Sequence, residues 1–355
     1  MKLKNASAAF ALLGVSALVL TGCAAAPEAE PTATETASEA PSVDYLACAV
    51  SDEGSWNDKS FNESVFDGLT KAQTELGVQI AEAESNSAED FAPNLQAMVD
   101  QACDITFAVG FNLVAAVNEA AKANPEMHFV TIDGWSEGNA NLKPVGYAME
   151  QSSYLAGYAA AAHSTSKVIG TYGGMQIDAV TAFMDGFYYG AKAYEAETGT
   201  AVTVLGWDPV AKTGDFMGDF APNSGVSKTI AATQIEAGAD VIFPVGGDQF
   251  GAVSEALSEA GSNGVMIGVD KNWSLLDEYN GKMLTSIEKR MTQAVYDIIK
   301  AGAVDKTEFT GDAYTGTLAN DGTALSETEF ITGDLKTKLD ELKAGIIDGS
   351  INPLS

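Results

Sequence analysis

The sequence contains few of the residues that catalysis and nucleic-acid binding commonly require. The 355-residue chain has two histidines and three cysteines, and 49 Asp and Glu outnumber 19 Lys and Arg, for a net charge of −30. Such a surface repels nucleic acid. His128 and His163 lie in no catalytic motif, and the chain has no glycine-rich phosphate loop and no metal-ligand spacing. We therefore expect a protein that is not an enzyme and that takes no cofactor, metal or nucleic acid.

The first 22 residues have the features of an export signal. Lys2 and Lys4 supply positive charge, and an apolar run over residues 8–20 is shorter than a comfortable membrane span. The run ends in LTGC at residues 20–23, which resembles the lipobox of bacterial lipoproteins. In that class the cysteine sulfur receives a lipid after the signal is cut. We therefore expect a lipid anchor on Cys23 at the extracytoplasmic face of the cell membrane. The alternative is an ordinary secretory signal with a coincidental cysteine.

Residues 23–43 form the expected tether between this anchor and the folded part. After Cys23 the segment consists mainly of Ala, Pro, Glu, Thr and Ser, and it has no aromatic residue, Lys or Arg. Such a tract buries too little apolar area to offset the entropy lost on ordering. We expect it to be disordered, with the folded chain beginning at residue 44.

From residue 44 onward, short β-rich runs alternate with helical patterns of apolar residues. This βαβ alternation indicates parallel sheets with helices on both faces. The units are too many for one sheet, so we expect an α/β protein of two similar lobes, with a ligand beyond the carboxyl ends of the strands. The expected strands are 46–50, 105–109, 129–132, 168–172, 202–205, 241–245 and 265–269, and the expected helices are 65–76, 113–123, 180–196, 228–237 and 252–260.

Cys48 and Cys103 are the two cysteines outside the leader. They are too few and too far apart in the sequence for a zinc site. Cys48 lies in the first expected strand and Cys103 just before a later one, so neighbouring strands could bring them together in an oxidising compartment. The alternative is that both are small buried apolar residues without a bond.

The segment SDEGSWNDKSFN, residues 51–62, follows the first expected strand and opens the first helix. Ser60 or Asn62 is placed to cap that helix. Phe61 at the helix start is harder to explain by packing, and its ring could stack on a planar ligand.

The same segment resembles the opening motif of the basic membrane protein family, lipoproteins that bind purine nucleosides for ATP-driven uptake. Further segments resemble the family in the same order along nearly the whole chain. They are EQSSYLAGY from residue 150, IGTYGGMQID from 169, FMDGFYYGAK from 183, ADVIF from 239, VGG from 245, IGVD from 267, LTSIEKR from 284 and IIDGSI from 346.

This resemblance implies a type I periplasmic-binding-protein fold with a ligand cleft between lobe I, residues 44–152 and 284–315, and lobe II, residues 153–283 and 316–355. It implies that the lobes close by hinge motion and that the closed form docks on the permease of an ABC importer, whose separate ATPase drives release. The base would lie between aromatic rings, and carboxylates and a lysine would take the polar groups. The implied ligand-binding residues are Asp52, Phe61, Asn62, Asp133, Phe183, Gly246, Asp270 and Lys289.

Several positions differ from the family's pattern near the expected site. Glu53 stands where an amide is common, and Ala179 where proline is common. Asp270 is followed by KNW, residues 271–273, where a second acidic residue is usual. Residues 214–227 resemble an inserted loop. Three further aromatic residues could reshape or cover the cleft or simply pack in the core, namely Trp56, Trp207 and Trp273.

These differences leave other functions open. The same fold could bind a sugar, riboflavin or another flat solute, or it could serve as a ligand-sensing surface receptor. A surface nucleoside hydrolase is a third alternative, which the missing Asp-rich calcium motif near the N-terminus argues against.

Overall fold

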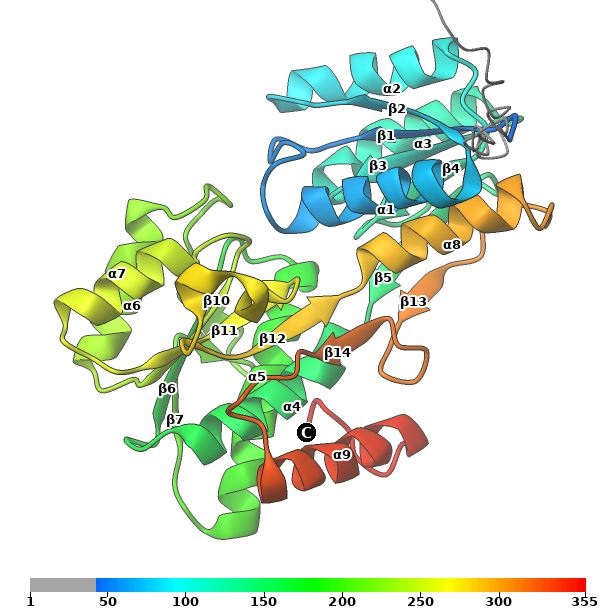
Figure 1. Ribbon diagram of the computed structural model, residues 1–355. Coiled ribbons are helices and arrows are strands. Elements are labelled where there is room, and N and C mark those ends of the chain that lie inside the picture. Colours follow the sequence, from blue (N-terminus) through cyan, green and yellow to red (C-terminus); the bar gives the residue numbers. More distant parts are fainter. Residues whose placement is uncertain (1–42) are drawn as a thin grey trace, which may run out of the picture. The chain divides into compact units, whose positions relative to one another are not determined.

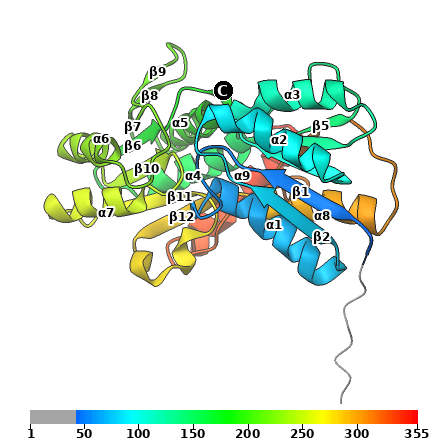
Figure 2. The same cartoon turned by 90° about the horizontal axis from the view of Figure 1, so that it is seen from above.

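The chain forms two six-stranded sheets, each flanked by helices (Figures 1 and 2). The structure is a computed structural model that describes residues 43–355. The signal peptide, Cys23 and the tether up to residue 42 lie outside the described residues. The expected α/β architecture with parallel sheets is confirmed. We call the first sheet with its helices lobe I and the second sheet with its helices lobe II.

The first sheet is parallel throughout. Its strands, in spatial order, are β13 (Tyr314–Gly316), β5 (Leu142–Tyr147), β4 (Phe129–Ile132), β3 (Ile105–Val109), β1 (Leu46–Val50) and β2 (Gln79–Ala83). Helices α1 (Phe61–Leu76) and α8 (Met291–Ala303) pack on one face, and α2 (Phe91–Asp100) and α3 (Val114–Ala123) pack on the other. Covered on both faces, strands β3 and β4 are wholly buried, which is why they read as continuous apolar runs.

The second sheet repeats this plan and is parallel except at its β14 edge. Its strands, in spatial order, are β14 (Thr323–Leu325), β12 (Met283–Lys289), β11 (Val265–Asp270), β10 (Val241–Val245), β6 (Val168–Gly173) and β7 (Thr203–Leu205). The accompanying helices are α4 (Met149–His163), α5 (Asp178–Thr198), α6 (Gly225–Glu236), α7 (Phe250–Glu259) and the C-terminal α9 (Gly333–Asp348). A two-stranded hairpin, β8 (Trp207–Asp208) and β9 (Thr213–Gly214), follows β7.

Glycines let α4 and α5 pack at unusually close range. A Cβ atom added at Gly157, Gly186 or Gly190 would clash with a backbone carbonyl oxygen of the facing helix. This close packing fixes α5, whose first turns face the cleft described below.

The chain passes between the lobes at β5–α4, β12–α8 and β13–β14. Helix α4 follows a strand of lobe I yet packs on α5, and α8 follows a strand of lobe II yet packs on α1. We expected the return to lobe I at residue 284, but β12 pairs with β11 and β14 as far as Lys289, so this crossing lies later, at Arg290. Strand β12 is buried and extends the parallel part of the second sheet. The motif LTSIEKR, which covers this strand, does not by itself indicate to which sheet the strand belongs.

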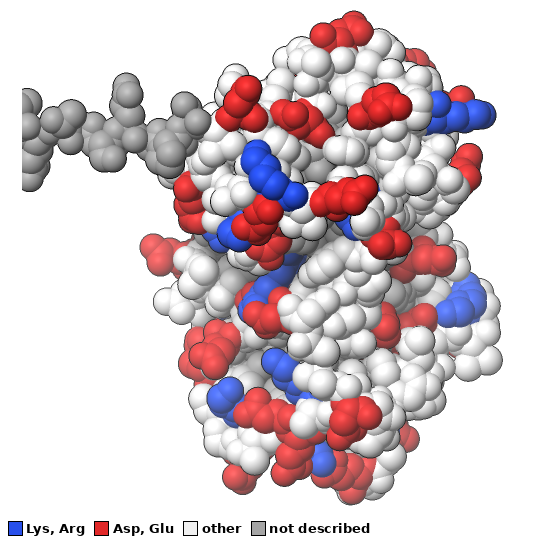
Figure 3. Space-filling view, turned by 90° about the vertical axis from the view of Figure 1, so that its right-hand side faces the viewer, with Lys and Arg blue, Asp and Glu red and all other residues white. Residues whose placement is uncertain are grey.

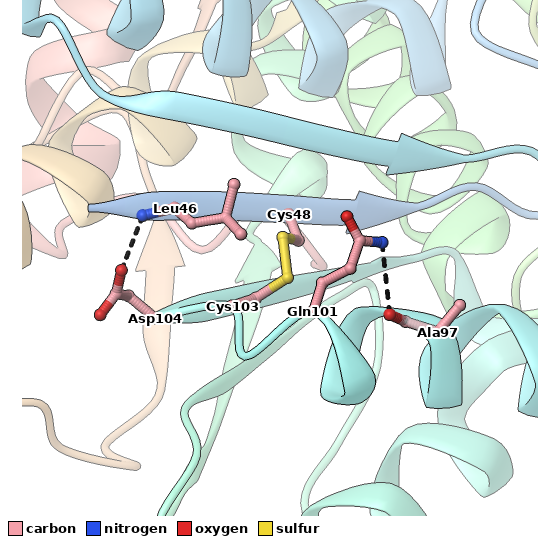
Figure 4. The surroundings of a disulfide bond; sticks show 6 residues. All are labelled: Leu46, Cys48, Ala97, Gln101, Cys103 and Asp104. Atoms are coloured by element: carbon pink, nitrogen blue, oxygen red, sulfur yellow. Dashed lines mark hydrogen bonds between the residues drawn. A yellow bond between two sulfur atoms is a disulfide. The ribbon is translucent and has the colours of Figure 1, made fainter. Parts of the chain in front are cut away.

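A disulfide joins Cys48 of β1 to Cys103, which lies just before the neighbouring strand β3 (Figure 4). The two Cα atoms are 6.0 Å apart, and both residues are buried in the cluster between the sheet and helices α2 and α3. Of the two alternatives left open by the sequence, the structure therefore has the bond.

No helix among residues 43–355 has the length and apolar character needed to cross a bilayer. Acidic side chains are spread over both halves of the face in Figure 3, with basic ones among them.

Candidate functional site

A cavity of about 520 Å³ lies between the two lobes, at the carboxyl ends of the strands. This volume suits a small organic ligand. Residues from both lobes line it, and all eight of the site residues expected from the sequence are among them. Their roles toward a ligand remain predictions.

Acidic side chains dominate the polar lining. The cavity is lined by seven acidic residues and one lysine, Lys289. The acidic residues are Asp52, Glu53, Asp58, Asp133, Asp219, Asp248 and Asp270. Hydrogen-bond acceptors therefore greatly outnumber cationic donors, which favours a ligand rich in N–H and O–H groups.

The segment between β1 and α1 builds the lobe I wall through a small carboxylate network. Asn62 donates from Nδ2 to Asp52 Oδ1 at 2.7 Å, and the Gly54 N–H donates to the same oxygen at 3.0 Å. Burial raises the pKa of Asp52 to about 6, against the lowering effect of these two hydrogen bonds. Gly110, at φ +101°, has no side chain, and this lets the Asp52 carboxylate lie against its backbone.

Asp58 holds the start of α1. Its carboxylate accepts hydrogen bonds from the backbone N–H groups of Ser60 at 2.8 Å, Asn62 at 2.8 Å and Glu63 at 3.1 Å. Burial raises its pKa despite these bonds. Neither Ser60 nor Asn62 caps the helix with its side chain as expected, because Asp58 satisfies these donors. Both side chains are thereby left to bond elsewhere.

Lys289, the last residue of β12, joins the two lobes at the back of the cavity. Its ammonium pairs with Asp133 of lobe I, and the two side chains are 3% and 10% exposed. The same ammonium lies 5.1 Å from the ring centroid of Phe61 and 5.4 Å from that of Tyr147. This single cation therefore orders a carboxylate and an aromatic ring that both face the cavity.

Asp270 ends β11 and completes the polar lining from lobe II. Its Oδ2 accepts from Ser60 Oγ across the cleft at 2.6 Å. Burial raises its pKa to about 6, while Lys289 and Ser60 act to lower it. Asp133 follows β4 at the equivalent place in the first sheet, and both aspartates have positive φ, +58° and +64°. Two non-glycine residues in this rare conformation at matching strand ends indicate a functional site.

Four phenylalanines line the cavity, and they differ in how free their rings are. Phe111, which follows β3, is partly buried. Phe61 is partly buried, whereas Phe183 of α5 is 3% exposed and packs toward Phe243 in the core of lobe II. Phe220, in the loop between β9 and α6, is 39% exposed and rests against Gly174. Phe220 therefore offers more ring surface to a ligand than the expected Phe183.

Phe220 lies in residues 214–227, the segment that we expected from the sequence to be a loop inserted relative to the family. This loop is held to the second sheet by backbone bonds from Met217 and Gly218 to the carbonyls of Gly173 and Gly174. The Met217 methyl group also lies against Gly246, so a side chain there would have to displace it. The loop thus forms one fixed wall of the cavity. The three tryptophans named above are each at most 5% exposed and do not line it, so the packing alternative holds for Trp56, Trp207 and Trp273.

Sequence reasoning missed Asp58, Phe220 and Asp248 as cavity residues. Asp58 had a signal, because it stands three residues before the helix, where an acidic side chain can accept from the first N–H groups. Asp248 follows β10 at a strand end, and its buried Oδ1 has no partner among the described residues. Phe220 lies in the segment 214–227, which the sequence placed near the site, but only the tertiary structure shows which aromatic residue of that loop lines the cavity.

The family described as ABC transporter substrate-binding protein PnrA-like (Bmp) matches residues 46–329. The chain belongs to this family. The resemblance stated from the sequence motifs is thereby confirmed.

Individual relatives agree with this membership of the Bmp family. The chain is 32% identical to the ABC transporter nucleoside-binding protein BmpA of Lactococcus lactis subsp. cremoris, over 87% of this chain and 88% of that protein. It is 26% identical to basic membrane protein A of Borreliella burgdorferi, over 84% and 85% of the two chains. The crystal structure of an ABC transporter solute-binding protein from Aeropyrum pernix K1 has a TM-score of 0.75 at 24% identity, covering 87% of this chain and 92% of that one. This last likeness supports the expected periplasmic-binding-protein fold.

Proposed function

We propose that this Bmp-family protein captures a purine nucleoside outside the cytoplasm, anchored by a lipid on Cys23, and delivers it to an ABC permease whose separate ATPase drives uptake. The observation that carries the ligand assignment is the cleft itself. It combines aromatic rings, a surplus of carboxylates and one buried lysine in about 520 Å³. The Lactococcus relative, whose printed name is that of a nucleoside-binding protein, supports the same assignment.

A nucleoside presents two chemistries that match the two kinds of lining. Its flat base can stack on an aromatic face, as Phe61 offers. Its ring N–H groups, exocyclic amines and ribose hydroxyls are donors, which the ionised Asp52 and Asp270 would accept. Lys289 would donate to a ribose oxygen while it neutralises Asp133. The surplus of carboxylates repels phosphate, so we expect nucleosides to bind and nucleotides to be excluded.

The second wall for the base is better provided by Phe220 than by Phe183. Stacking requires an open ring face, and Phe183 has lost its exposed surface to the core of lobe II. We therefore expect Phe61→Ala and Phe220→Ala each to weaken nucleoside binding by about 1–3 kcal/mol, the usual loss for one base–aromatic stack. Trp135→Ala removes a 56% exposed aromatic residue outside the cavity lining and is the matched control. Equal affinity of all three variants and the wild type would refute stacking at both phenylalanines.

The ligand assignment is tested by mass spectrometry of material carried through purification and by calorimetry. Titrations with adenosine, guanosine, inosine and uridine should release heat for the purine nucleosides, whereas ribose, riboflavin and adenosine monophosphate should give none. No heat with any nucleoside would overturn the assignment, and heat with ribose or riboflavin alone would replace it with the sugar or flavin alternative.

The anchor is tested separately. Cys23→Ser in the full chain should release the protein from the membrane fraction and abolish incorporation of labelled palmitate, since stable attachment depends on the acyl chains. Retention of both by the variant would refute the anchor without affecting the ligand assignment.

A further inference from the structure

Two consecutive residues of lobe II, Asp270 and Lys271, reach across the cleft to the first turns of α1 in lobe I. Lys271 Nζ lies 2.6 Å from Glu63 Oε1 and 3.3 Å from Asp67 Oδ2. Next to it, Ser60 Oγ donates to Asp270 Oδ2 at 2.6 Å. Lys59 and Asp248 form a further, longer charge pair between the lobes, at 3.9 Å.

Lys271 does not line the cavity, unlike Asp270. Its side chain is about one-third exposed, as is that of Glu63, while Asp67 is about half exposed. The contacts of Lys271 with Glu63 and Asp67 therefore connect the two lobes at the solvent-exposed rim of the cleft. Lys271 itself does not border the space that a ligand would fill. Because all partners are protein groups, the attraction acts whether the cleft is filled or empty.

The backbone directs both side chains of this segment toward lobe I. The Lys271 N–H donates to the Val269 carbonyl at 2.7 Å, and Asp270 between them has φ +64°. This is a tight three-residue turn that non-glycine residues seldom adopt and that persists where its surroundings hold it. The contacts of Asp270 and Lys271 with Ser60, Glu63 and Asp67 of the opposite lobe stabilise this turn.

We propose that Lys271, with Glu63 and Asp67, forms an electrostatic clasp that favours the closed arrangement of the lobes and slows ligand release. Lys271 is a positioning residue in this scheme, since it acts on the lobes and never touches the ligand. The effect on release rests on the proposed nucleoside function, whereas the effect on closure does not.

The clasp is tested by reversing its charge and restoring it. Lys271→Glu places three carboxylates together, and Lys271→Glu with Glu63→Lys re-creates an opposite-charge pair. Lys122→Glu is the matched control, because Lys122 pairs with Glu119 in its own helix, and both side chains are more than 70% exposed. The first readout is the radius of gyration of the ligand-free full chain by small-angle X-ray scattering, and the second is the dissociation rate of adenosine by surface plasmon resonance.

We expect Lys271→Glu to increase the radius of gyration and to release adenosine about three to ten times faster, the range for losing one or two partly exposed ion pairs. The double variant should restore both values toward those of the wild type. Raising the salt to about 1 M, where the screening length falls to about 3 Å, should move the wild type toward the Lys271→Glu values.

The clasp is overturned if Lys271→Glu matches the wild type and Lys122→Glu in both readouts, or if the double variant fails to reverse its effect. A protein that binds neither adenosine, guanosine nor inosine yet expands with Lys271→Glu would refute the proposed ligand and leave the clasp standing. A protein that binds adenosine with unchanged release and unchanged dimensions would refute the clasp and leave the ligand standing.

Discussion

Replacing Lys289 by methionine should destabilise the unliganded protein strongly, because the carboxylates of Asp133 and Asp270 lose their neighbouring cation. Methionine keeps most of the length of the lysine side chain but removes its charge and its hydrogen-bond donors. The lysine side chain is 3% exposed and that of its partner Asp133 is 10% exposed, so water cannot compensate the lost ion pair. Asp270 also loses the cation that acts to lower its pKa.

The magnitude follows from the burial of the pair. Removing one member of a buried ion pair costs about 3–5 kcal/mol, several times the value of an exposed pair. The penalty depends on pH with a definite sign. The pKa of Asp270 is already about 6 and rises further without the lysine. Its carboxyl group therefore becomes uncharged as the pH falls toward about 5, and its share of the penalty shrinks.

Urea unfolding of the unliganded protein near pH 7.5 and near pH 5 measures this. Lys300→Met is the matched control, since Lys300 pairs with Asp305 at 2.8 Å but both side chains are more than 40% exposed, and we expect a much smaller loss of stability. Adding Asp133→Asn to Lys289→Met should recover much of the stability. A loss no larger than that of the control, or a loss that grows toward pH 5, would refute the reasoning.

Three further predictions concern pH, helix packing and the disulfide. The pKa values of Asp52 and Asp270 are both raised to about 6, so nucleoside affinity measured by calorimetry should fall about tenfold at pH 5 for each carboxylate that must be ionised. Binding there should release protons, which the heats measured in different buffers would show. Affinity that is flat from pH 5 to about 7.5 would contradict a role of these carboxylates in binding. Their contribution to the stability of the unliganded protein has the opposite trend: it is present below about pH 4 and is lost as the pH rises through 6. Gly190→Ala forces a methyl group onto the facing helix and should lower unfolding stability by at least about 1–3 kcal/mol, while Gly225→Ala, which meets open space, should change it little; equal midpoints for the two variants would argue against the close packing. Reducing the disulfide, which spans 55 residues, should cost about 2–4 kcal/mol by the chain-entropy argument, and an unchanged urea midpoint after reduction would contradict this.

The strands nearest the site were largely predictable because they are buried on both faces. The expected strand at residues 105–109 coincides with β3, and that at 265–269 falls one residue short of β11. By contrast, β2 at Gln79–Ala83 lies at a sheet edge and is only partly buried, so its mixture of polar and apolar residues gave no strand signal. The return to lobe I was predicted at residue 284 instead of Arg290 for a related reason. An apolar strand such as β12 does not indicate which of two equivalent sheets it joins.

The sequence by itself determined the α/β class, the family and the eight expected cavity residues, because strand-end position and motif order are local properties of the chain. Only the tertiary structure decided what those residues contact. It paired Cys48 with Cys103 and Lys289 with Asp133, across 55 and 156 residues of sequence. It also brought the exposed ring of Phe220 to the cleft while burying that of Phe183. Such choices depend on distances between segments far apart in the chain, which neither periodicity nor spacing encodes.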